Sequence, residues 1–227
     1  MQERWIENQG VRLQVLESGS EGTPLLFVPG TPGPAADFAP DMEALAPRRT
    51  LAVSLRGAVP SDAPVSGYRL EDFASDVGAV AEGLERPCLV GFSIAVPYVL
   101  AWAADQPDHV GGLVLIDYPA RYPSFSPEWA ERVVASAPPE FFRPNVVRGV
   151  QRDSVATELW DRLGRITCPV LILRGGQGSR LSDADLACYR SALPQAEVIA
   201  FRESGHDVRR PHRDRFQAAL AAFVDRL

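Results

Sequence analysis

Short apolar segments alternate along the chain with longer segments in which apolar residues recur at helical spacing. The short segments are rich in β-branched residues and are bounded by proline or glycine, which is typical of buried parallel strands. They predict strands over residues 5–8, 11–17, 25–28, 50–55, 88–90, 113–116, 170–173 and 197–201. The longer segments predict helices over residues 35–46, 70–84, 95–105, 183–192 and 213–226. This alternation predicts an α/β fold with a mostly parallel sheet of roughly eight strands that is flanked by helices.

Two features of the chain refine this organisation. Gln9-Gly10 joins the first two strands, and such a turn sequence favours an antiparallel hairpin at the edge of the sheet. Residues 118–165 carry prolines and aromatic residues, Phe141 and Phe142 among them, but no good strand. We interpret this segment as a small helical lid inserted into one α/β-core, which is formed by residues 1–117 and 166–227.

Composition and charge exclude several classes of protein. The 227-residue chain has a formal charge of -6 and a pI near 5.2, whereas a nucleic-acid-binding protein needs a basic surface. All 23 basic residues are arginine, so the chain has no lysine for a Schiff base, a pyridoxal phosphate linkage or a P-loop. The cysteines and histidines lack the spacing of metal ligands. We therefore expect no metal, no cofactor and no nucleic-acid partner.

The N-terminal segment and the cysteines indicate the cellular compartment. Charged residues near the start of the chain stand where a secretory signal peptide needs an apolar stretch, and no apolar run is long enough to span a membrane. The three cysteines are an odd number without C-x-x-C spacing, which is typical of buried or half-buried structural thiols: Cys88, Cys168 and Cys188. Such thiols indicate a reducing compartment. We expect a soluble, cytoplasmic protein without a membrane partner.

The strongest chemical signal is the sequence Gly91-Phe92-Ser93-Ile94-Ala95, which runs from an apolar strand into a helix. Small residues two positions before and after the serine let the strand and the helix pass close to each other, so the Ser93 hydroxyl is held out of the sheet. Such a serine is a candidate nucleophile. The alternative is that Ser93 caps the N-terminus of the following helix.

A nucleophilic serine needs a base, and the chain has three histidines. His206 follows the predicted strand that ends at Phe201, and open α/β sheets place functional groups at the carboxyl ends of their strands. His109 precedes a strand and so lies at the opposite end of the sheet. His212 follows Arg-Arg-Pro at a helix start, where it is expected to be solvated. By elimination, His206 is the predicted base.

These motifs and their order resemble the α/β-hydrolase fold over essentially the full chain. The resemblance implies that two backbone N–H groups bind the oxyanion of a reaction intermediate. One belongs to Ile94, and the other belongs to Thr31 in the loop at residues 27–33, where Pro29 replaces a histidine that is usual in the family. The resemblance also implies a serine hydrolase with a short lid.

The acid that would orient His206 departs from the usual pattern of the family. Family members usually carry an aspartate beyond the strand at residues 170–173, but this chain has a glycine-rich segment without a carboxylate there. Asp117 ends the preceding strand, which is the position of the acid in some dehalogenases and lipases. Asp183 is a second candidate, although its place in the first turn of a helix is well explained by the helix dipole. A Ser-His dyad without an acid is the third possibility, and Asp207 is expected to point elsewhere.

The leading hypothesis is a hydrolase of a small-molecule ester, lactone or thioester that forms an acyl-enzyme on Ser93, with His206 as base and Asp117 as acid. Four further residues are expected to contact the substrate: Phe92, Tyr118, Arg121 and Trp129. Arg121 could bind a carboxylate or phosphate, or it could be ordinary surface charge. The alternatives are a lyase, cyclase or carbon-carbon bond hydrolase that uses the Ser/His pair for acid-base chemistry, and a non-catalytic ligand receptor.

Overall fold

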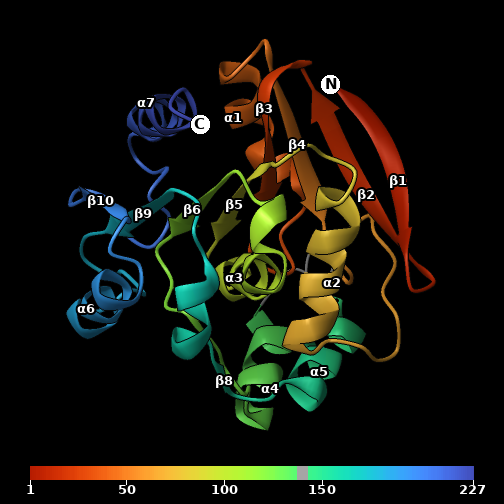
Figure 1. Cartoon of the computed structure of the whole chain (residues 1–227). Helices are drawn as coiled ribbons and strands as arrows, with labels where there is room; N and C mark the ends of the chain where they lie inside the picture. Colours follow the sequence, from red (N-terminus) through yellow and green to blue (C-terminus); the bar gives the residue numbers. More distant parts are fainter. Residues whose placement is uncertain (137–142) are drawn as a thin grey trace.

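An eight-stranded, mostly parallel sheet forms the centre of the computed structural model, which describes residues 1–136 and 143–227 (Figure 1). Its strands are β1 (Gln2–Asn8), β2 (Val11–Ser18), β3 (Glu21–Val28), β4 (Arg48–Ser54), β5 (Cys88–Phe92), β6 (Gly112–Ile116), β9 (Val170–Gly175) and β10 (Glu197–Phe201). They lie in the order β1-β2-β4-β3-β5-β6-β9-β10. β2 is antiparallel to both of its neighbours, and the remaining pairs are parallel. The predicted α/β fold class is confirmed, and each predicted strand has a counterpart.

The hairpin β1–β2 forms one edge of the sheet, as the sequence predicts. Both turn residues have positive φ, 52° at Gln9 and 77° at Gly10. This backbone conformation matches the right-handed twist of the two strands, and glycine adopts it without a steric penalty.

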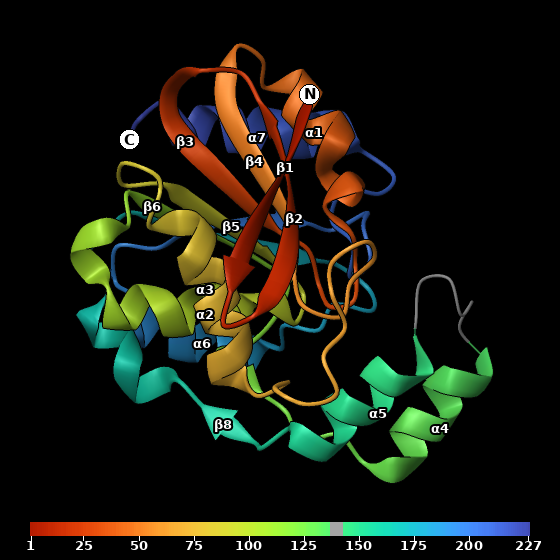
Figure 2. The same ribbon diagram turned by 90° about the vertical axis from the view of Figure 1, so that its right-hand side faces the viewer.

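Helices cover both faces of the sheet (Figure 2). One face packs against α1 (Ala39–Ala44), preceded by the short 3-10 helix η1 (Ala35–Phe38), and against α7 (Arg213–Val224). The other face packs against α2 (Leu70–Ala81), α3 (Ala95–Asp105) and α6 (Asp183–Ala192). The side chains of each central strand alternate between the two layers, so that Leu26 and Val28 join one apolar cluster while Leu25 and Phe27 join the other.

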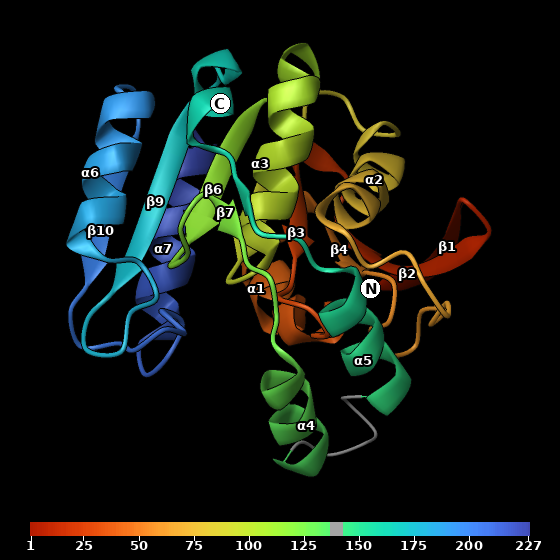
Figure 3. The same ribbon diagram turned by 90° about the horizontal axis from the view of Figure 1, so that it is seen from below.

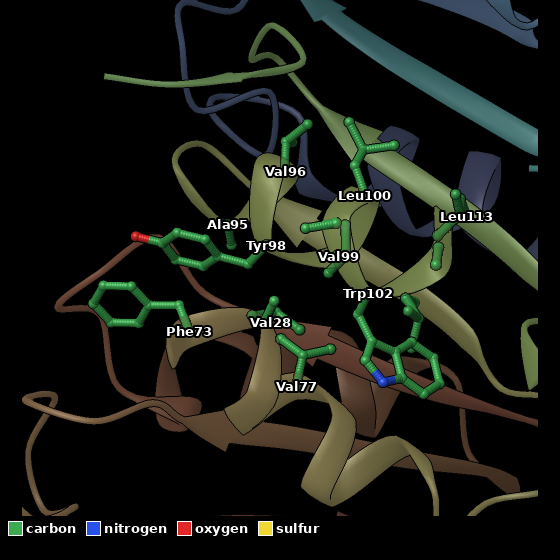
Figure 4. Packing of buried hydrophobic residues seen from close by; sticks show 14 of the residues in the cluster. Val28, Phe73, Val77, Ala95, Val96, Tyr98, Val99, Leu100, Trp102 and Leu113 are labelled. Atoms are coloured by element: carbon green, nitrogen blue, oxygen red, sulfur yellow. The ribbon is translucent and has the colours of Figure 1, made fainter. Parts of the chain in front are cut away.

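Helix α3, which follows β5, packs closely against α2 and the sheet (Figure 4). A Cβ atom added at Gly78 would lie 2.5 Å from Nε1 of Trp102, so only glycine allows this contact between the helices. Phe73 stacks on Tyr98 with ring centroids 4.5 Å apart. These contacts fix α3, and with it the turn that carries Ser93.

Residues 118–165 are described except for 137–142 and contain more than the predicted helices. The elements are β7 (Arg121–Tyr122), α4 (Pro127–Ser136), α5 (Pro144–Asp153), β8 (Thr157–Glu158) and the 3-10 helix η3 (Trp160–Arg165). The absence of strands was a wrong prediction, because β7 and β8 pair antiparallel. Each strand has only two residues, which is too few for the alternation of apolar and polar residues to be recognised in the sequence. α4 and α5 lie side by side away from the sheet (Figure 3). Phe141 and Phe142, which the sequence assigns to the predicted lid, lie outside the described residues.

Two further predictions concern the cysteines and the membrane. Cys88 and Cys168 are buried, as predicted, but Cys188 is exposed. The reason is that α6 buries Leu186 and Tyr189 on its inner face, which leaves Cys188 on the solvent side. Within residues 1–136 and 143–227, no helix is long and apolar enough to cross a bilayer.

The tyrosines should make the protein sensitive to alkali. Burial raises the pKa of all five above the ordinary value of about 10, and that of Tyr68 to about 12. Because the folded state holds these protons more tightly, their contribution to the free energy of unfolding is complete below about pH 10 and is lost as the pH rises through the raised values. We expect phenolate absorbance to appear near pH 10 only in denaturant. Several tyrosines ionising near pH 10 while circular dichroism remains native would contradict this expectation.

Candidate active site

Ser93 occupies a sharp turn between β5 and α3, in a strained backbone conformation with φ of 57°. A Cβ atom added at Gly91 would lie 2.8 Å from Cγ2 of Val99, so the motif requires glycine two residues before the serine. The Ser93 N–H donates to the Ile116 carbonyl on the neighbouring strand at 3.0 Å, which holds the turn against β6. Ile94 is the N-cap residue of α3, and no side chain caps that helix. The capping interpretation of Ser93 is therefore wrong.

His206 lies in the loop between β10 and α7, and its imidazole contacts the Ser93 hydroxyl. Nε2 of His206 is 2.7 Å from Oγ of Ser93. The loop approaches the end of β9 so closely that a Cβ atom at Gly175 would lie 2.1 Å from the Gly205 carbonyl oxygen. His109 and His212 are both exposed. The structure therefore brings together the serine and the histidine that the sequence selected.

Asp117 completes this chain of contacts from the end of β6. Its carboxylate is fully buried, and Oδ2 lies 2.9 Å from Nδ1 of His206. The end of β9 and the loop that follows it supply three more donors to the carboxylate: the N–H of Gly175 at 2.7 Å, the N–H of Arg180 at 2.9 Å and the hydroxyl of Ser179. The glycine-rich segment that lacks an aspartate thus binds the aspartate of the neighbouring strand. Sequence reasoning missed Ser179 and Arg180, since nothing in their sequence context marks them.

The other candidate acids form ion pairs elsewhere. Asp183 is 93% exposed at the side chain and pairs with Arg174 at 2.6 Å. Asp207 turns away from the imidazole and pairs with Arg209 at 2.8 Å. Burial pushes the pKa of Asp207 up, but the hydrogen bonds and charge of Arg209 outweigh it, so that this pKa lies below its ordinary value. Of the carboxylates considered, the structure places only Asp117 at His206.

A stack of rings holds the imidazole from the side of β5. The ring of Phe92 lies on that of His206, with centroids 5.2 Å apart and planes inclined by 27°. On Phe92 lies the guanidinium of Arg209 at 4.8 Å, and the same group is 4.6 Å from the centroid of Phe38. Because this stack crosses from η1 to the loop that carries His206, it restrains the loop against the end of the sheet.

A cavity of about 320 Å³ opens onto Ser93 and His206. Its lining residues are Thr31, Pro32, Ser93, Ile94, Tyr98, Tyr118, Phe125, Trp129, Val146, Val147, Val150, Arg180 and His206. The walls are mostly apolar and come from α3, α4, α5, the segment before α4 and the loops at the carboxyl ends of β3, β5, β6, β9 and β10. Burial holds the pKa of Tyr98 well above its ordinary value, so its phenol stays protonated. A small organic molecule fits such a cavity.

Thr31 and Ile94, which the family resemblance implies as oxyanion-binding residues, both line this cavity. Within the described residues, neither of their backbone N–H groups donates to another protein atom. The loop that carries Thr31 passes so close to the serine that a Cβ atom at Gly30 would lie 3.1 Å from Cβ of Ser93. Two free donors are therefore available beside the hydroxyl.

The four predicted substrate contacts divide into two pairs. Tyr118 and Trp129 line the cavity. Phe92 and Arg121 are not among the described residues that line it, and the structure corrects both predictions. Phe92 packs on His206 instead, and the guanidinium of Arg121 pairs with the carboxylate of Asp185 on α6. In the part of the chain that the structure describes, no cluster of three or more His, Cys, Asp or Glu side chains could hold a metal ion.

Comparisons with known proteins agree with the fold. N-formylmaleamate deformylase of Pseudomonas putida is 24% identical, with 97% of this chain and 95% of that protein covered. 2-(Acetamidomethylene)succinate hydrolase of Mesorhizobium japonicum is 28% identical, with 98% and 95% covered. The crystal structure of E-2-(acetamidomethylene)succinate hydrolase has a TM-score of 0.79 at 25% identity and covers 98% of both chains. Residues 25–223 match the profile of the alpha/beta hydrolase family. The chain therefore belongs to the alpha/beta hydrolase family.

Proposed function

We propose that the protein is a serine hydrolase that cleaves a carboxylic ester, lactone or thioester of a small molecule through an acyl-enzyme on Ser93. One observation carries the proposal: His206 lies 2.7 Å from the Ser93 hydroxyl through Nε2 and 2.9 Å from the Asp117 carboxylate through Nδ1. In this arrangement the imidazole can accept the hydroxyl proton while the buried carboxylate stabilises the resulting cation.

The reaction would proceed in two halves. His206 takes the Ser93 proton as Oγ attacks the substrate carbonyl, and the N–H groups of Thr31 and Ile94 bind the oxyanion. As the tetrahedral intermediate collapses, the bond to the alcohol or thiol breaks and His206 returns the proton to this leaving group. Water, deprotonated by His206, then attacks the acyl-enzyme. The bond between the acyl group and Oγ breaks, His206 returns the proton to Ser93, and the carboxylic acid is released. Asp117 is proposed to keep the imidazole oriented throughout both halves.

A second candidate reaction is hydrolysis of an N-acyl bond by the same residues. The relatives favour it, since the names of both enzymes specify an N-acyl group, formyl in one and acetamido in the other. The leaving group would then be a nitrogen, to which His206 must return a proton for the bond to break. Comparing an ester and an amide of the same acyl group measures which bond the site prefers.

The acyl-enzyme is tested by covalent trapping. A fluorophosphonate is expected to modify Ser93, as identified by peptide mass spectrometry, and p-nitrophenyl acetate should give a burst of p-nitrophenolate that matches the enzyme concentration. His206→Ala should abolish both signals, whereas the matched control His109→Ala, at an exposed histidine, should retain them.

Absence of both signals in the folded wild-type protein would overturn the acyl-enzyme. It would favour a lyase, cyclase or carbon-carbon bond hydrolase, in which the Ser/His pair moves protons without being acylated. A Ser93→Ala protein with an undiminished biological effect would instead favour a ligand receptor.

A further inference from the structure

One charged residue that lines the cavity has no role in the proposed proton transfers. Arg180 is the only permanently charged residue among the described residues that line the cavity with Ser93 and His206. The neighbouring walls consist largely of aromatic and aliphatic side chains. A full positive charge in an apolar lining is a candidate ligand contact, because ligand pockets use a small number of polar groups to select and orient their ligands.

The backbone holds Arg180 beside the catalytic candidates. Its N–H donates to Oδ2 of Asp117 at 2.9 Å, and the same oxygen lies 2.9 Å from Nδ1 of His206. The Arg180 backbone therefore shares a hydrogen-bonding atom with the imidazole that contacts Ser93. The position of this residue is thus tied to the reacting groups, while its side chain remains exposed.

Other arginines near this end of the molecule already have partners. Arg121 pairs with Asp185, and Arg209 pairs with Asp207. Within residues 1–136 and 143–227, no carboxylate lies within ion-pair distance of the Arg180 guanidinium. The side chain thus has its donors available for a ligand, and guanidinium donors match the geometry of a carboxylate.

We propose that Arg180 forms an anion subsite, and that the preferred substrates carry a carboxylate on the acyl side or the leaving side of the bond that Ser93 attacks. This inference rests on the proposed function, since it names the class of substrate for the same site. It also relocates the expected anion contact from Arg121, in the segment at residues 118–165, to the loop after β9. The net charge of -6 gives the protein as a whole no attraction for anions, so the proposed preference rests on the local charge of Arg180.

The test compares two esters that differ in charge. Mono-p-nitrophenyl glutarate carries a carboxylate, and p-nitrophenyl pentanoate is a neutral ester of similar length. In the wild-type protein kcat/KM for the glutarate is expected to exceed that for the pentanoate by about tenfold to a hundredfold, the range of a charged hydrogen bond. Arg180→Gln should bring this ratio close to one while pentanoate hydrolysis continues. Arg180→Lys, which keeps the charge without the paired donors, should give an intermediate ratio.

Arg202→Gln is the matched control, because it removes the same charge from an exposed arginine outside the lining residues. It should leave the ratio unchanged. Equal ratios in wild type, Arg180→Gln and Arg202→Gln, or an equal loss of both esters in Arg180→Gln, would overturn the anion subsite. Failure of the proposed function has a different signature, since Ser93→Ala would then hydrolyse both esters as fast as the wild type.

Discussion

Replacing Ser93 by alanine is expected to lower kcat for ester hydrolysis on the order of 10⁶-fold, the loss seen when the nucleophile of a Ser-His-Asp triad is removed. In the proposed mechanism the substitution removes the atom that forms the acyl bond, and His206 has no hydroxyl proton to accept. Steady-state rates with p-nitrophenyl acetate measure the effect. Residual activity should reflect only the cavity and the proposed oxyanion donors, since the substitution leaves both in place.

The fold of the Ser93→Ala protein should be preserved. Alanine keeps the Cβ atom and therefore meets the strained φ of 57° with much the same steric demands as serine. Thermal unfolding followed by circular dichroism checks this point. A Ser93→Ala protein that unfolds like the wild type and retains more than about a tenth of its kcat would rule out the nucleophilic role.

The sequence was sufficient to predict the sheet, the turn at Ser93 and the position of His206, because each depends on a local sequence pattern. Strand and helix periods identified the parallel sheet, and the small residues Gly91 and Ala95 on either side of Ser93 marked the turn. His206 could be selected because a histidine at the carboxyl end of a strand lies at the edge where such a turn points. These predictions rest on a few adjacent residues whose backbone geometry is the same in many proteins.

Side-chain partners from distant segments could not be predicted in the same way. Phe92 precedes Ser93 in the sequence, yet its ring packs between the imidazole of His206 and the guanidinium of Arg209. Arg121 pairs with a helix that begins more than 60 residues later. Such contacts depend on how loops pack against one another, and the periodicity of apolar residues does not predict that packing. Arg180 shows the converse, since a loop arginine that no sequence motif marks lines the cavity.

Asp117 was only one of three open alternatives in the sequence, and the structure now makes the choice testable. Asp117→Asn is expected to lower kcat on the order of 10⁴-fold, the effect of the same substitution in a serine protease triad. The amide can donate to Nδ1 of His206, which favours the tautomer whose Nε2 carries the proton and cannot accept that of Ser93. The carboxylate also accepts from Gly175 and Arg180, so we expect a lower melting temperature as well.

Asp183→Asn separates the catalytic effect of Asp117 from a general loss of negative charge. It changes the charge by the same amount at a residue whose side chain is 93% exposed and paired with Arg174. We expect kcat within about twofold of wild type, since exposed ion pairs are weak. The decisive measurement is kcat for both variants at a temperature where both are folded. If Asp183→Asn abolished turnover and Asp117→Asn did not, the contact between Asp117 and His206 would be structural, and the acid would have to reach the imidazole in a conformation different from this one.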